Sequence, residues 1–235
     1  MKIHRFHTKE LNLDTKTTTL TIADEGLVHQ WNKVLRFSPG ETVELFDEMG
    51  FSLLVKLTEI NKKHAIFEIL ERRKKDIFQP NLSLFVSCIK KDNFEFLVQK
   101  VTEIGVREIT PILSNRSQNK NLTIKRLQKI SIEATEQSGG FLPPNICEIT
   151  SLEAAILNVK KSGKRIIVCD FDGVFFTEIG RTLDSNYALF IGPEGGWGDQ
   201  DKELFERHSI QKVSFGTRVL RTETAAIVAA WEFSK

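Results

Sequence analysis

The pattern of apolar and polar positions changes once along the chain, near residue 70. Before that point, short apolar runs alternate with turn signals such as those at 38–40 and 48–50. Within the runs apolar residues recur at every second position, as in strands with one buried face. One short helix is expected at about 29–35. This pattern predicts a small β-barrel, because closure of a sheet removes its exposed edges.

After the charged stretch at 71–76, the pattern becomes one of strands alternating with helices. Residues 82–88 are almost continuously apolar, which is typical of a strand buried on both faces. Asp92 is expected to cap the next helix and Gly105 to end it. Further strands are expected at 108–113, 165–169, 187–190 and 212–215, and helices at 123–138, 152–160 and 222–233. The order predicts an α/β domain with a mostly parallel sheet, so we expect two domains, 1–71 and 72–235.

Two glycine-containing loops each follow a strand of this second domain and precede a helix. They read IGPEGG at 191–196 and GTRVLRTETA at 216–225, and Thr222 or Thr224 is expected to cap the last helix. Open α/β sheets bind ligands at the carboxyl ends of strands. Neither loop has the GxxxxGK or GxGxxG pattern, which disfavours ATP, GTP and NAD. A single loop of this kind is more often a plain turn, but the pair predicts a binding site.

Composition narrows the class of protein. With 40% hydrophobic and 27% charged residues, the chain is typical of soluble globular proteins. No long apolar run and no signal peptide are evident, so we expect a cytoplasmic protein without a membrane span. Cys88, Cys147 and Cys169 are far apart and predict reduced thiols, with no metal site. Residues 71–130 hold 13 Lys and Arg against six Asp and Glu, which indicates either a polyanion-binding surface or a solvated helical face.

Several segments together resemble one known family. They are HQWNKVLRFSPG at 29–40, FEFLVQKVTEIGVREITP at 94–111, NRS at 115–117, KISIEATEQSGGFLPP at 129–144, GPEGG at 192–196 and SFGTRVLRTETAA at 214–226. The sequence is similar to the RsmE family, the 16S ribosomal RNA uridine-N3 methyltransferases. The resemblance implies a C-terminal SPOUT trefoil-knot methyltransferase domain, α/β with a mostly parallel sheet, preceded by a small PUA-like β-barrel that binds RNA. Periodicity alone does not predict a knot.

The resemblance implies S-adenosyl-L-methionine as the methyl donor, transferred to N3 of a specific uridine in 16S ribosomal RNA. It also implies a homodimer that acts on 16S ribosomal RNA or the small ribosomal subunit. Two alternatives stay open: a related SPOUT enzyme acting on another base or a ribose 2′-hydroxyl, and a non-catalytic ribosome-binding module. By position, the cofactor residues are Leu113, Ser114, Ile191, Gly192, Pro193, Glu194, Gly195, Gly196, Phe215, Gly216, Val219, Leu220, Thr222 and Ala225.

Methylation at N3 removes a proton and leaves negative charge on the uracil, which a guanidinium stabilises. Arg221 is the first choice for this role; the alternative is a salt bridge to Glu223 or Glu194. Glu194 acts either as general base or, as we favour, as a carboxylate that fixes the loop through backbone amides. RNA contacts are expected from Arg5, Lys33 and Arg36 in the first domain and from Arg116 in the second.

The chain departs from the family pattern at three positions. Gly140 stands where the family usually has arginine, and Gln30 and Trp31 replace the apolar or histidine residues usual in the first-domain motif. None of these lies in the two glycine loops. The departures therefore bear on RNA affinity more than on the chemistry of methyl transfer.

Overall fold

A computed structural model describes residues 3–9, 11, 17–77, 79–118, 121–179 and 186–234. The chain divides into two compact units, Met1–Phe78 and Gln79–Lys235. Strand β5 (Ala65–Lys74) runs through the position where we expected the domain boundary. Most of the charged stretch at 71–76 is therefore strand, and the division between the units follows it.

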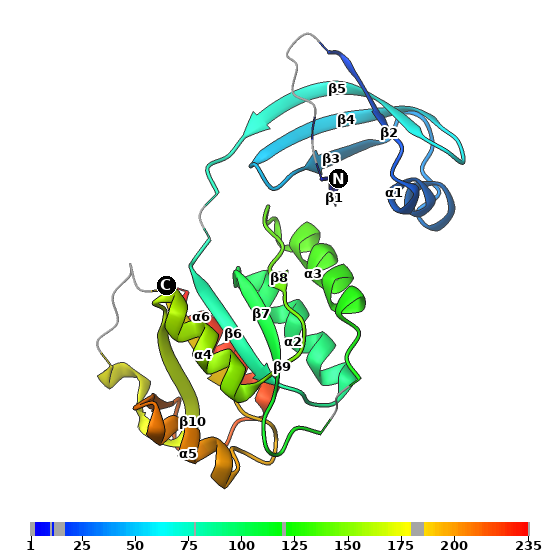
Figure 1. Ribbon diagram of the computed structural model, residues 1–235. Coiled ribbons are helices and arrows are strands. Elements are labelled where there is room, and N and C mark those ends of the chain that lie inside the picture. Colours follow the sequence, from blue (N-terminus) through cyan, green and yellow to red (C-terminus); the bar gives the residue numbers. More distant parts are fainter. Residues whose placement is uncertain are drawn as a thin grey trace. The chain divides into compact units, whose positions relative to one another are not determined.

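The first unit is a five-stranded sheet in the order β1-β3-β4-β5-β2 (Figure 1). Strand β1 lies parallel to β3, and the other neighbours are antiparallel. The remaining bounds are β1 (His4–His7), β2 (Thr19–Ile22), β3 (Thr42–Phe46) and β4 (Phe51–Ile60). The apolar residues at alternate positions form the core of this unit, as the period of two predicted.

The short helix expected at 29–35 begins earlier and changes its winding. Helix α1 (Glu25–His29) continues directly into the π-helical turn η1 (Gln30–Val34). This turn places Trp31 at the centre of the core, where its ring meets Phe6 and Phe67 edge-on at 5.4 and 5.3 Å. The departure from the family motif at Trp31 therefore fills the interior of the first unit and does not change its outer surface.

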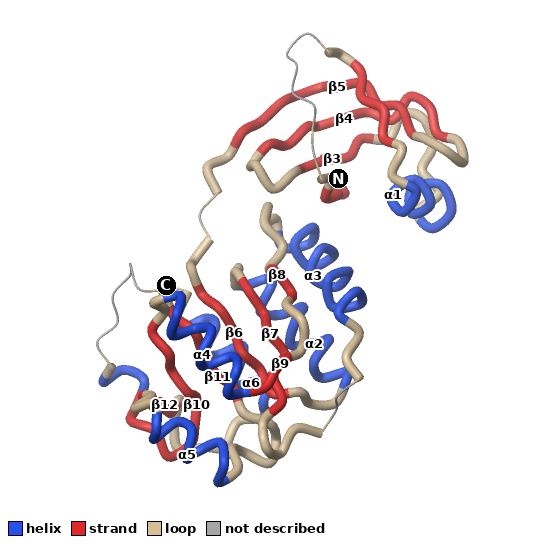
Figure 2. Tube along the Cα trace, viewed as in Figure 1, coloured by secondary structure: helices blue, strands red, loops and turns tan. Residues whose placement is uncertain are grey.

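The second unit is a parallel sheet in the order β12-β10-β11-β6-β7-β8, with β9 also paired to β7 (Figure 2). The two central strands, β6 and β11, are buried along their whole length, as the continuous apolar runs predicted. The strand bounds are β6 (Leu82–Ser87), β7 (Glu108–Leu113), β8 (Asn145–Ile146), β9 (Thr150–Ser151), β10 (Arg165–Phe175), β11 (Tyr187–Ile191) and β12 (Gln211–Ser214).

Helices cover both faces of this sheet. Helices α2 (Lys91–Ile104), α3 (Ile124–Ser138) and α6 (Thr222–Phe233) share one apolar core with the strands. Helices α4 (Leu152–Ser162) and α5 (Asp199–Arg207) share the other. The short 3₁₀ turn η2 (Phe176–Glu178) follows β10. This arrangement is the α/β domain that the alternating pattern predicted.

The glycines predicted to end the helices are confirmed, but the residues predicted to cap their amino ends are not. Gly105 and Gly139 end α2 and α3 in the left-handed region, with φ of 95° and 80°. The expected cap at Asp92 is wrong, because α2 begins at Lys91 and Asp92 lies in its first turn. The expected caps at Thr222 and Thr224 are also wrong: the N-cap of α6 is Arg221. In the described part of the chain, no helix is long and apolar enough to cross a membrane.

Candidate active site

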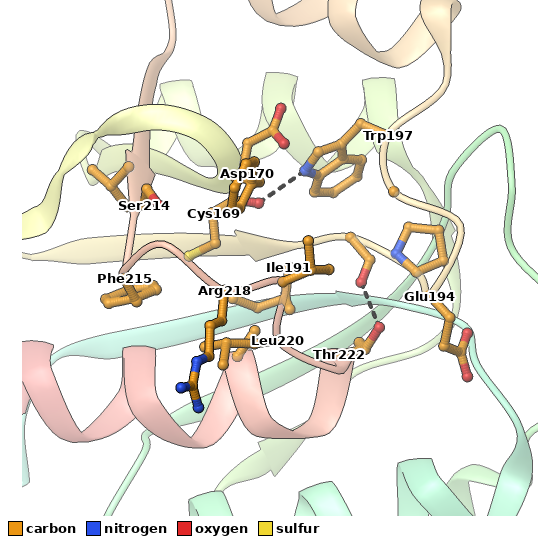
Figure 3. Close-up of a pocket in the computed structure, with 17 residues that line it drawn as sticks. Cys169, Asp170, Ile191, Glu194, Trp197, Ser214, Phe215, Arg218, Leu220 and Thr222 are labelled. Atoms are coloured by element: carbon orange, nitrogen blue, oxygen red, sulfur yellow. Dashed lines mark hydrogen bonds between the residues drawn. The ribbon is translucent and has the colours of Figure 1, made fainter.

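A pocket lies at the edge of the sheet where β11 and β12 end, beside the middle of β10 (Figure 3). Both glycine loops contribute to it, one after β11 and one after β12, as expected for ligand binding at the carboxyl ends of parallel strands. Of the predicted cofactor residues, those lining it are Ile191, Gly192, Pro193, Glu194, Gly196, Phe215, Val219, Leu220, Thr222 and Ala225. Leu113, Ser114, Gly195 and Gly216 lie outside this lining.

Sequence reasoning missed a third wall of the pocket. The middle of β10, where its pairing with β11 stops, contributes Cys169, Asp170 and Phe171. The end of β12 adds Val213 and Ser214, and the segments that follow β11 and β12 add Trp197 and Arg218. The rule that placed the two glycine loops also applies to β10, because this strand pairs with both β11 and β12 in parallel. The expected strand at 165–169 ends directly before Asp170 and Phe171, so the same rule could have indicated this wall from the sequence.

Two hydrogen bonds fix the walls of the pocket to one another. The Thr222 hydroxyl donates to the Gly192 carbonyl at 2.9 Å and so joins the start of α6 to the first loop. The Trp197 indole N–H donates to the Cys169 carbonyl at 3.0 Å and joins that loop to β10 (Figure 3). A Cβ on Gly192 would lie 3.0 Å from the Trp197 ring. Glycine at this position therefore lets the indole pack directly on the loop backbone.

Hydrogen bonds involving the segment 114–117 hold the first glycine loop, at 191–196, in place. One Arg116 guanidinium nitrogen donates to the Gly195 carbonyl at 2.8 Å. The buried carboxylate of Asp201 accepts from the Asn115 backbone N–H at 3.0 and 3.1 Å and from the Gly198 N–H at 2.9 Å. A Cβ on Gly198 would lie 2.2 Å from the Asn115 side-chain oxygen. Leu113, expected in the pocket, thus precedes the segment that supports the first loop, and Ser114 begins that segment.

The two predicted catalytic residues lie on the two loops. Glu194 lines the pocket and is exposed, and the described residues offer its carboxylate no hydrogen bond. Its expected role in fixing the loop falls instead to Thr222, Arg116 and Asp201. Arg221 is exposed outside the pocket lining, and its carbonyl accepts from the Ala225 N–H at 2.8 Å. In the described part of the chain, no ion pair links Arg221 to Glu194 or to Glu223.

The predicted RNA-binding residues fall into two groups. In the first unit, Arg5 pairs with Glu44 at 3.1 Å and its guanidinium lies 4.3 Å from the centre of the Phe46 ring. Lys33 and Arg36 are exposed at the end of the helical segment, and Arg36 adopts a φ of 55°. In the second unit, Arg116 supports the first loop. Arg5 and Arg116 therefore each have a structural contact besides any role toward RNA.

The three cysteines are free in the structure. Burial raises the pKa of Cys88 to about 11. Burial and the neighbouring Asp170 carboxylate also raise the pKa of Cys169, although this residue lines the pocket. Both thiols are therefore protonated at neutral pH, and neither acts as a nucleophile. In the residues that the structure describes, no group of three His, Cys, Asp or Glu is placed to hold a metal ion.

The exposure of the three thiols predicts an order of reactivity. At neutral pH, iodoacetamide is expected to modify Cys147 well before Cys88 or Cys169, because Cys147 is only partly buried and the other two are buried. Burial raises the pKa of Cys147 too, so its modification is expected to be slower than that of a fully exposed thiol. Peptide mass spectrometry over a time course measures the order. Denatured protein serves as the control and should show similar rates for all three. Rapid labelling of Cys169 in the native protein would contradict the prediction.

Comparisons with known proteins agree with this architecture. Residues 78–233 match the model of an RNA methyltransferase domain, and 33–70 match that of an RNA methyltransferase PUA domain. The ribosomal RNA small subunit methyltransferase E of Synechocystis sp. is 30% identical over 91% of this chain and 71% of its own length. That of Rickettsia conorii is 28% identical over 91% of this chain and 88% of its own length.

A solved structure gives the same result for the fold. The crystal structure of ribosomal RNA small subunit methyltransferase E from Neisseria gonorrhoeae, bound to S-adenosyl methionine, superposes with a TM-score of 0.84. It is 31% identical, with 97% of this chain and 95% of that chain covered. The expected fold class, a SPOUT α/β-knot domain preceded by a PUA-like domain, is confirmed. The chain belongs to the ribosomal RNA small subunit methyltransferase E family of RNA methyltransferases.

Proposed function

We propose that this RNA methyltransferase uses S-adenosyl-L-methionine to methylate N3 of a specific uridine in 16S ribosomal RNA. The observation that carries the proposal is the pocket formed by the two glycine loops and residues 169–171 of β10. The relative from Neisseria gonorrhoeae, whose fold this chain shares, is bound to S-adenosyl methionine. The 16S RNA, free or within the small ribosomal subunit, is accordingly the proposed partner, and the cytoplasm the proposed location.

The pocket has the chemistry that this cofactor requires. Apolar side chains of Ile191, Phe215 and Leu220 offer a surface for an adenine ring, and the loops offer backbone groups for its polar edge. One carboxylate oxygen of Asp170 is buried and has no hydrogen-bond partner among the described residues. A buried acceptor of this kind fits a hydroxyl or ammonium of a ligand. The lack of a phosphate-binding loop pattern also fits, because this cofactor has no phosphate.

In the proposed reaction, residues of the chain stabilise the negative charge that forms on the uracil and receive its N3 proton. The bound cofactor supplies an electrophilic methyl group on a sulfonium. Arg221, at the start of α6, provides positive charge where N3 loses its proton, and the amino end of the helix adds to it. Glu194 lines the pocket with a carboxylate that makes no hydrogen bond to the described residues, so it is the side chain we assign to receive the N3 proton.

We propose further that the protein works as a homodimer. Val219, in the second loop, is 79% exposed and Trp231, on α6, is 54% exposed. Large apolar side chains exposed on and beside one alanine-rich helix suit a subunit contact.

Replacing Trp231 with glutamate is therefore expected to shift the protein to monomers, as measured by sedimentation velocity. Leu157→Glu, on α4, is the control at another exposed apolar position. If the Trp231→Glu variant remains dimeric, this face of α6 is not the subunit contact.

Nucleoside analysis tests the proposed reaction. Small subunits from cells lacking the enzyme are incubated with the purified protein and S-adenosyl-L-methionine, and the digested 16S RNA is analysed by liquid chromatography and mass spectrometry. We expect one new N3-methyluridine. A 2′-O-methyl nucleoside, or a methyl group on another base, would replace the proposal with a related SPOUT activity. Calorimetry that detects no binding of S-adenosyl-L-methionine would favour the non-catalytic ribosome-binding module.

A further inference from the structure

Strand β10 leaves its regular pairing where it reaches the pocket. Cys169 is opposite Val213 of β12, and Val174 is opposite the same residue, so residues 170–173 form a bulge between them. A Cβ on Gly173 would lie 2.5 Å from the backbone of Val213. Only glycine allows this close approach, so the sequence specifies the bulge. Bulges beside active sites commonly redirect a side chain.

Two residues of this bulge line the pocket, Asp170 and Phe171, and Phe171 is the aromatic one. It lines the pocket and is 51% exposed, which is unusual for phenylalanine. The other two aromatic residues of the lining are already packed: Trp197 is 3% exposed, and the Phe215 ring lies 5.3 Å from that of Phe176. In the described lining, Phe171 is therefore the aromatic ring with the most accessible surface.

The charges around Phe171 select the kind of ligand that it can accept. It lies between Asp170 and Asp172, and one oxygen of Asp170 is buried without a hydrogen-bond partner among the described residues. The charged residues of the pocket lining are Asp170, Glu194 and Arg218. Phosphates bind where lysine and arginine neutralise them, so a lining with two carboxylates and one guanidinium disfavours the RNA backbone. A flat, uncharged ring with N–H donors suits an aromatic face next to a free carboxylate oxygen.

We propose that Phe171 is the platform on which the target uracil stacks when it is presented to the methyl donor. The inference rests on the proposed function and names the residue that receives the base. Methylation at N3 requires an unpaired base, because N3 lies on the pairing edge, and a base taken out of its stack is commonly held against an aromatic side chain. The bulge fixes the ring beside the two cofactor loops, where such a base must lie.

Kinetics of matched variants test this role. Phe171→Ala is expected to lower kcat/KM for the RNA by about tenfold to a hundredfold, the usual effect of losing one base-stacking contact. Binding of S-adenosyl-L-methionine, measured by calorimetry, and the sedimentation coefficient should stay unchanged. Phe171→Trp should recover most of the activity, because it keeps an aromatic face. Phe175→Ala, an exposed phenylalanine of the same strand outside the pocket lining, should behave as wild type.

A photochemical readout addresses the contact directly. RNA with 5-iodouridine at the methylated position is irradiated in the presence of the protein, and the cross-linked peptide is expected to contain Phe171. Unchanged kcat/KM in Phe171→Ala would overturn the inference. So would an equal loss of cofactor affinity, which places the ring on the adenine, or a loss of the dimer, which places it in a subunit contact. Failure of the wild-type protein to form N3-methyluridine would instead reject the proposed function.

Discussion

Arg221→Ala is expected to lower kcat by about a hundredfold to a thousandfold, the effect usual for removal of one group that stabilises charge in a transition state. Affinity for S-adenosyl-L-methionine should change little, because Arg221 lies outside the lining of the pocket. The side chain is exposed at the amino end of α6, and its backbone carbonyl continues the helix through Ala225. Truncation of the side chain therefore leaves the helix intact while removing a positive charge.

Single-turnover methylation and calorimetry separate the two quantities. Arg221→Lys is the matched variant and should retain part of the rate, since it keeps the charge but loses the planar guanidinium. Circular dichroism of both variants should match that of the wild type. If Arg221→Ala loses cofactor affinity in proportion to its rate, the residue shapes the pocket and has no direct role toward the uracil.

The spacing of apolar residues along the chain was sufficient to predict most of the fold. The period of two in the first unit and the continuous apolar runs of β6 and β11 are direct consequences of which strand faces are buried. The ends of α2 and α3 were predicted because a left-handed residue strongly favours glycine. Starting positions were less predictable: Asp92 is a good cap by type, but the N-cap of α2 is Lys90, two residues before the predicted position.

The parts of the site that the sequence did not predict depend on contacts between distant segments. Asn115 and Asp201 are 86 positions apart, and no local pattern indicates that they meet. The β10 bulge depends on the fit of Gly173 against Val213 of another strand. The two glycine loops could be predicted because each is a continuous strand–loop–helix corner. Resemblance added the knot and the cofactor, which neither spacing nor periodicity indicated.

Asp201→Asn is expected to weaken both the fold and the pocket. The buried carboxylate accepts hydrogen bonds from the backbone N–H groups of Asn115 and Gly198. An asparagine amide offers one oxygen and turns two donors toward these groups. Losing hydrogen bonds to a buried charged acceptor costs about 2–3 kcal/mol in the free energy of unfolding, which urea denaturation measures. Asp199→Asn is the matched control, since Asp199 is exposed in the same helical turn.

The functional effect of Asp201→Asn should exceed what reduced stability alone produces. Asp201 holds segment 114–117 against the first loop, and that loop carries Gly192, Glu194 and Gly196 into the pocket. Displacement of these groups by a fraction of an ångström is expected to lower kcat/KM by about tenfold to a hundredfold at temperatures where the variant remains folded. Affinity for S-adenosyl-L-methionine should fall with it, and Asp201→Glu should restore part of both. A variant that is less stable but keeps wild-type cofactor affinity would show that the loop holds its shape without this carboxylate, through Arg116 and Thr222 alone.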